Sequence, residues 1–305
     1  MKRSKNMSLE ITKQAVNKMT IVGKLIETNF RSGTTKDGRQ YESANFTVRT
    51  EQTYEDGHVE VDEIPISIFA TQFTSTGAPH PGYRGIQELK ELKTIQQVGE
   101  AEADRVRMTA ANVRENNFVS RSGQLVNGWQ INTPFIGTAG ASPDIAIFNI
   151  NIFIMDMHDE IDREGNPTGR LVIKGGIVQY GGTLDVVEFI VEDPDKINYI
   201  SRNWEVNDTV NAGGHIRVTT REVKTSAESG SWGEALPDTS TQYMRELIIT
   251  RGSDFGFEED LAYDPADIKR AFNERKARIE QLQINAKQPK ANPQAGTAAS
   301  KYSWA

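Results

Sequence analysis

Apolar and polar residues alternate in several short runs of this sequence, and the first two runs are the clearest. Residues 17–28 are rich in β-branched and apolar types. In the next run Ala44, Phe46 and Val48 share one face of an extended chain, and polar residues occupy the other face. An Asp-Gly pair between the runs supplies a turn. The pattern predicts two strands joined by a basic, glycine-bearing loop over residues 31–40, with one face of the second strand available to bind a ligand.

Further elements follow at regular intervals in the first half of the chain. Residues 59–69 alternate up to Pro65, which predicts a third strand that bends or bulges there. Apolar residues at three-residue steps from Ile86 to Val98 predict a short amphipathic helix after a loop. Residues 105–114 predict a fourth strand, and residues 118–131 predict a hairpin that turns at Ser122-Gly123. This order of elements is that of the OB barrel, a five-stranded Greek-key barrel that binds oligonucleotides on its second and third strands.

A family resemblance supports this interpretation. The segment Asn-Lys-Met-Thr-Ile-Val-Gly-Lys-Leu at residues 17–25, followed by Ala-Asn-Phe-Thr-Val at residues 44–48, resembles the opening of single-stranded DNA-binding proteins of the OB type. The resemblance covers residues 17–50 and implies non-catalytic binding of single strands. It also implies that the hairpin between the last two strands carries a stacking aromatic residue, for which Trp129 is the candidate.

The element order repeats after a linker of small residues at 137–144. Strands are expected over residues 145–157, 170–179, 184–191, 208–223 and 244–250, with a helix that begins at Asp193-Pro194 and runs to Trp204. Gly213-Gly214 is expected to mark a β-bulge. The repeat lies in the order of elements and not in residue identity, and it predicts a second OB-like barrel.

Length and composition agree with two soluble domains. The chain has 305 residues, which exceeds the usual size of one domain. It contains no cysteine, and its start, Met-Lys-Arg-Ser-Lys, lacks the apolar core of a signal peptide, so a cytoplasmic protein is expected. The net charge is −7, but residues 1–40 carry nine Lys or Arg against three Asp or Glu. A basic groove can therefore exist on an acidic molecule.

The predicted fold class is mainly β, with tandem OB-like five-stranded Greek-key barrels, a C-terminal helix and a disordered tail. The expected divisions are a flexible arm at 1–15, an OB domain at 16–136, a linker at 137–144, a second OB-like domain at 145–253, an acidic segment and helix at 254–285, and the tail at 286–305.

Binding of single strands needs cations for phosphates and aromatic faces for bases. Such residues lie on the strands and loops that the barrel pattern places at its binding surface. In the first domain they are Arg31, Lys36, Arg39, Tyr41, Arg49, Tyr54, Arg107, Arg114, Phe118, Arg121 and Trp129. In the second domain they are Arg170, Lys174, Tyr180, Arg217, Arg221, Lys224 and Trp232.

Two of these assignments have alternatives. Trp129 and Phe118 can equally be cross-strand partners that stabilise the hairpin. In the second domain, acidic residues from Asp185 to Asp195 would repel phosphate, so this barrel can serve dimerisation or partner contact instead of DNA.

Enzymatic functions find little support. The four histidines lack the spacing of metal ligands, and the acidic cluster at 156–162 lacks the pattern of a calcium loop. The Gly-Gly pairs at 175 and 181 flank a strand and not a strand-to-helix turn, so they form no phosphate-binding fingerprint. No catalytic residue, metal or cofactor is expected.

The sequence therefore predicts a sequence-tolerant protein that coats and protects single-stranded DNA in replication, recombination or repair, in the style of a bacteriophage protein. The alternative is a phage structural or assembly protein that uses its barrels for protein contacts. The tail at 286–305 carries three lysines, no acid and Trp304, whereas the bacterial family ends in an acidic tip. Replication or recombination proteins, or another subunit, are the expected partners of this tail.

Overall fold

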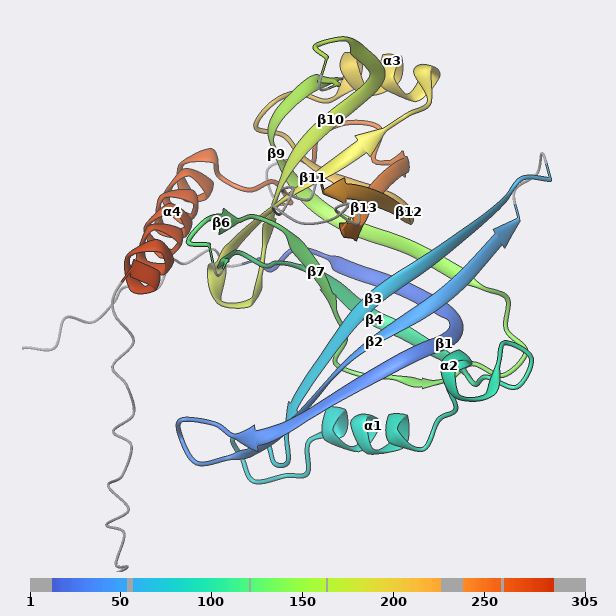
Figure 1. The fold of residues 1–305 in the computed structure, drawn as a ribbon. Helices are drawn as coiled ribbons and strands as arrows, with labels where there is room; N and C mark the ends of the chain where they lie inside the picture. Colours follow the sequence, from blue (N-terminus) through green and yellow to red (C-terminus); the bar gives the residue numbers. More distant parts are fainter. Residues whose placement is uncertain are drawn as a thin grey trace, which may run out of the picture.

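The computed structural model describes residues 13–53, 57–120, 122–162, 164–225, 238–258 and 261–287, and between residues 220 and 243 it describes backbone only. In this part of the chain the strands form two closed barrels (Figure 1). No helix among these residues is long and apolar enough to cross a membrane.

The first barrel has the OB topology. Its strands are β1 (Asn17–Thr34), β2 (Gln40–Thr53), β3 (Val59–Thr71), β4 (Arg105–Glu115) and β7 (Trp129–Asn132). The order around the barrel is β1-β2-β3-β7-β4, and β4 pairs back with β1. The β3–β7 pair is parallel and the other pairs are antiparallel. Helices α1 (Pro81–Lys90) and α2 (Ile95–Val98) lie between β3 and β4.

The second barrel repeats this connectivity. Its strands are β9 (Ile145–Ile161), β10 (Pro167–Val178), β11 (Leu184–Val191), β12 (Thr209–Thr225) and β13 (Asp238–Gly252). The order is β9-β10-β11-β13-β12, closed by pairing of β12 with β9, and β11 and β13 are parallel. Helix α3 (Pro194–Asn203) lies between β11 and β12, and a short turn, η1 (Tyr180–Gly182), precedes β11. The predicted tandem of OB barrels is confirmed.

Three short strands and the C-terminal helix complete the described chain. These are β5 (Phe118–Val119), β6 (Leu125–Val126), β8 (Gly137–Thr138) and α4 (Pro265–Lys287). The β5–β6 pair is the predicted hairpin, with Gly123 in its turn at φ +80°. Residues 1–12 of the arm expected at 1–15 and residues 288–305 of the tail expected at 286–305 lie outside the described residues, whereas Ala15 is buried in the core and residues 286–287 belong to α4.

Two local predictions need correction. The chain does not form one helix from Ile86 to Val98, because α1 already begins at Pro81, where His80 caps it, and a second cap at Thr94 starts α2. Pro65 does not bulge β3, since the register between β2 and β3 continues through it without a shift.

The predicted bulge at Gly213-Gly214 is confirmed by a register shift between β12 and β13. A Cβ atom on Gly214 would lie 1.8 Å from the carbonyl oxygen of Ile248 on β13. Only glycine permits this approach of the two strands.

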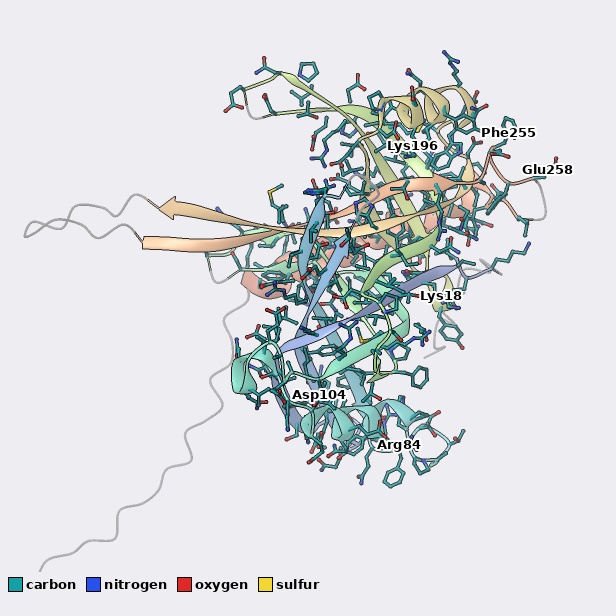
Figure 2. All side chains as sticks on the ribbon, turned by 90° about the vertical axis from the view of Figure 1, so that its right-hand side faces the viewer. Lys18, Arg84, Asp104, Lys196, Phe255 and Glu258 are labelled. Carbon is teal, nitrogen blue, oxygen red and sulfur yellow. The ribbon has the colours of Figure 1, made fainter. Side chains whose placement is uncertain are left out.

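The two barrels are joined through β1 and β9. These strands pair antiparallel from Asn17 to Val22, so all barrel strands belong to one 11-stranded sheet. Figure 2 shows the two joined barrels, with Arg84 and Asp104 at the far end of the first barrel and Lys196 and Phe255 on the second barrel. Helix α4 lies against the second barrel beside the hairpin of the first (Figure 1), and Arg275 on α4 forms an ion pair with Glu115 on β4.

A buried carboxylate makes a second contact between the barrels. Asp62 on β3 is 1% exposed, and its Oδ1 accepts a hydrogen bond from the backbone N–H of Val218 on β12 at 2.6 Å. Its Oδ2 is buried without a hydrogen-bond partner among the described residues. Burial raises the pKa of Asp62 from 3.8 to about 6. The ionised side chain therefore lowers the stability of the fold at neutral pH.

We expect Asp62→Asn to raise the free energy of unfolding at pH 8 by up to about 3 kcal/mol, since a shift of one pKa unit corresponds to about 1.4 kcal/mol. In the wild type the folded state binds an extra proton between pH 3.8 and about 6. Its stability therefore decreases as the pH rises through this window, and the advantage of the variant grows.

Urea denaturation at pH 4, 6 and 8 measures this difference. Asp156→Asn is the control, because Asp156 is exposed on β9, and it should not raise the free energy of unfolding. A gain from Asp62→Asn that is equal at all three pH values would contradict the assignment.

Candidate nucleic-acid interface

The outer face of the first barrel carries the polar half of the alternating strands. On β2 the side chains of Ala44, Phe46 and Val48 are buried, so the residues between them point outward. A groove of about 470 Å³ lies on this face across β2, β3, β7 and β4. Its lining includes Asn45, Phe69 and Arg114, together with further uncharged polar residues.

An aromatic pair borders the groove. The side chain of Phe69 is 57% exposed, and its ring centroid lies 5.1 Å from that of Tyr41 on the neighbouring strand. Tyr41 in turn lies across Gly33 of β1, where a Cβ atom would come within 2.8 Å of the tyrosine hydroxyl. Glycine at position 33 thus lets the tyrosine lie flat beside Phe69, and the two rings present an apolar surface to solvent.

Phe69 is absent from the residues selected from the sequence. The signal was present, because Ile64, Ile66 and Ile68 alternate on β3 and are buried in the core. The residue that follows Ile68 must then point outward. Phe69 is therefore a large apolar side chain exposed on the outer face of β3.

Cations flank the aromatic pair on one side. Arg31 on β1 is in register with Ser43 on β2, and Ser43 is in register with Phe69. Arg31 and Lys36 are exposed, and neither side chain has a hydrogen bond or ion pair with another described residue. Arg39 differs, since Asp37 holds its Nε at 2.8 Å.

Three other cations of the first barrel lie elsewhere or are engaged. Arg49 shares Glu100 with Lys24, each at 3.5 Å, at another groove of the barrel. Arg107 is exposed, but it lies in the half of β4 that pairs with β8, away from Arg114. Arg114 itself borders the groove and binds Asp185 of the second barrel at 2.9 Å. Burial raises the pKa of Asp185, while Arg114 opposes the increase.

The hairpin aromatics take different positions. Phe118 is 48% exposed on β5. Trp129 is half-buried against the core, and the guanidinium of Arg245 from the second barrel lies 5.2 Å from its ring centroid. Trp129 thus packs against the second barrel, a contact that neither of the two roles expected from the sequence describes. Tyr54 and Arg121 lie outside the described residues.

Two of the candidate arginines in the second barrel are held by ion pairs. Arg170 binds Glu246 at 2.5 Å, and Arg217 binds both Glu192 and Glu60 at 2.6 Å. Glu60 belongs to β3, so Arg217 links the barrels. The carboxylates of Glu192 and Glu60 raise the pKa of Arg217 against the opposing effect of burial.

The remaining candidates of this barrel do not form a cluster with these arginines. Lys174 has no ion pair within the described chain, but it lines a groove with Glu160, Glu188 and Glu246. Tyr180 is 86% exposed on the turn before β11. The side chains of Arg221 and Lys224, and all of Trp232, lie outside the described residues.

The fold and the outer face define a protein of the tandem OB-barrel class. The YorF family model matches residues 15–285, and the chain belongs to the YorF family. Comparison with curated proteins gives no match.

Two solved structures share the fold. They are the wild-type single-stranded DNA binding protein from Thermus aquaticus and a deletion mutant of it. Each is 10% identical to this chain, and the alignment covers 83% of this chain and 98% of the other. The TM-scores are 0.51 for the wild type and 0.50 for the mutant.

We expect Arg217→Ala to lower the free energy of unfolding by about 1–3 kcal/mol, because Glu60 and Glu192 then lose the cation that compensates them. Affinity for oligonucleotides should stay the same. Lys174→Ala on the same barrel is the matched control and should change stability by less than about 0.5 kcal/mol. Urea denaturation and an oligonucleotide titration of both variants provide the measurements. Wild-type stability together with weakened binding for Arg217→Ala would place this arginine on the nucleic acid.

Proposed function

We propose that this protein is a non-catalytic single-stranded DNA-binding protein that coats and protects exposed strands. The strand lies on the outer face of the first barrel. Bases stack on Phe69 and Tyr41, and phosphates meet Arg31 and Lys36. The binding energy comes from base stacking and from release of counterions.

The exposed ring of Phe69 is the observation that carries this proposal. At 57% exposure it is a large apolar side chain on a strand whose other face is fully packed. Stacking of a base on such a ring contributes about 1–3 kcal/mol. Its register with Arg31 through Ser43 supports the proposal, since it brings a cation to the same outer face as the aromatic pair.

The second barrel supports the first and contributes little direct binding. Its arginines are held by carboxylates, and the acidic residues around Lys174 disfavour phosphate. Roles in replication, recombination or repair, a bacteriophage source, a homo-oligomer and a cytoplasmic location stay predictions of the sequence. The same is true of partner binding through residues 286–305.

Titration of the full chain with oligo-dT over a range of salt concentrations tests the proposal. We expect binding at low salt that weakens steeply as salt increases. A structural or assembly protein would show no affinity for oligo-dT even at low salt, and that result would reject the proposed function.

Phe69→Ala is expected to weaken oligo-dT binding by about 1–3 kcal/mol, since a stacking surface is lost. Phe255→Ala is the control, because Phe255 is 63% exposed on the second barrel (Figure 2). Fluorescence anisotropy with a labelled oligonucleotide measures both affinities. Equal affinities for the two variants would remove Phe69 from the site.

Replacing Arg31 and Lys36 together by Ala should reduce the slope of log K against log salt by about 1.4, at about 0.7 per phosphate contact on a single strand. The control is the pair Lys196 and Arg202 on α3, which should keep the wild-type slope. Unchanged slopes in both double variants would show that Arg31 and Lys36 are not on the path of the nucleic acid.

A further inference from the structure

A row of amide side chains crosses the outer face of the first barrel. The register of the strands aligns one residue from each of five neighbours, β1, β2, β3, β7 and β4. In this order they are Asn29, Asn45, Ser67, Asn132 and Asn112. Each is exposed or half-buried. With neighbouring strands about 4.8 Å apart, the row follows the curved wall of the barrel for about 19 Å, and all of its members except Asn29 line the groove.

The fold does not require amides at these positions. Outward positions on a strand accept many polar residues, and Asn is among the types that strands disfavour. Four asparagines in one row therefore point to recognition of a ligand, and the row adjoins the aromatic pair, since Ser67 and Phe69 are successive outward residues of β3.

Hydrogen bonds within the row fix which groups remain available. Ser67 Oγ donates to Asn45 Oδ1 at 2.8 Å, and Gln130 Nε2 donates to Asn132 Oδ1 at 3.0 Å. Each of these amide carbonyls thus accepts one hydrogen bond from within the protein. The NH₂ groups of Asn45 and Asn132 have no partner among the described residues, so the centre of the groove offers two hydrogen-bond donor groups.

The charge of the groove agrees with a neutral ligand group. None of the five residues in the row is charged, and the cation in the lining, Arg114, is already held by Asp185. The groove therefore attracts phosphate only weakly, and the cations available for phosphate are Arg31 and Lys36, on and after β1. An uncharged groove of this kind suits the edge of a base better than a phosphate.

We propose that this asparagine row reads base edges and gives the protein a preference for keto bases, thymine and guanine, over amino bases, adenine and cytosine. Thymine presents O4 and guanine presents O6 as acceptors, whereas adenine and cytosine present an NH₂ group at the same place. The amino bases would set donor against donor at Asn45 and Asn132. This inference rests on the proposed function and makes the coat selective instead of sequence-tolerant.

Two complementary 16-nucleotide strands, d(GT)₈ and d(CA)₈, provide the test, because each contains one purine and one pyrimidine per repeat and so matches the other in stacking. The full chain should bind d(GT)₈ at least about fivefold more tightly, as expected for one to two well-formed base contacts. In Asn45→Ala/Asn132→Ala the preference should fall to less than about twofold.

Thr47→Ala is the matched control, since Thr47 lies on the same outer face of β2, one outward position from Asn45, and bonds Glu27 and not the row. It should keep the wild-type preference. The single variants Asn45→Ala and Asn132→Ala, each checked by thermal unfolding, should each lose part of it.

The outcomes separate the two proposals. Tight binding of both strands with equal affinity would overturn the base-reading row and leave the proposed function intact. A preference that survives in the double variant would also overturn it. Absence of binding to either strand at low salt would reject both proposals.

Discussion

Pairing of β1 with β9 is the interaction on which the rest of the structure depends. β1 has 18 residues and takes part in three ladders, with β2, β4 and β9. It closes the first barrel and at the same time joins that barrel to the second. Register shifts near Met19 and Leu25 change the strand's direction between these ladders. The register of a strand decides which side chains face outward and which residues lie beside them. The register of β1 therefore also sets where Asn29 and Arg31 lie relative to β2 on the outer face.

The junction between the barrels also decides which cations remain available. Arg114, Arg217, Arg245 and Arg275 all reach across it to a carboxylate or an aromatic ring of the other half. A guanidinium that is held in this way keeps its charge but offers fewer donors to phosphate. Arg31 and Lys36 lie away from the junction. The difference between the barrels therefore arises both from their contact with each other and from ion pairs within the second barrel, such as that of Arg170 with Glu246.

The barrels were predictable because several strands alternate with period two, while β10 and β11 read as nearly continuous apolar runs, and because Asp193 marks the start of α3. The strand order of both barrels follows from that element order. The site was less predictable. Sequence patterns select Arg170 and Arg217 by type, yet their carboxylate partners come from strands far apart in the chain. Phe69 was within reach of the alternation rule, whereas the asparagine row needs the register of five strands, which the sequence does not display.

The proposed function depends most on one claim, that single-stranded DNA binds to the outer face of the first barrel. Ultraviolet crosslinking of bound oligo-dT to the full chain, followed by mass spectrometry of the peptides, tests this location directly. The proposed function predicts crosslinks in the peptides that contain Tyr41 and Phe69. Crosslinks confined to residues 145–252 of the second barrel would contradict it.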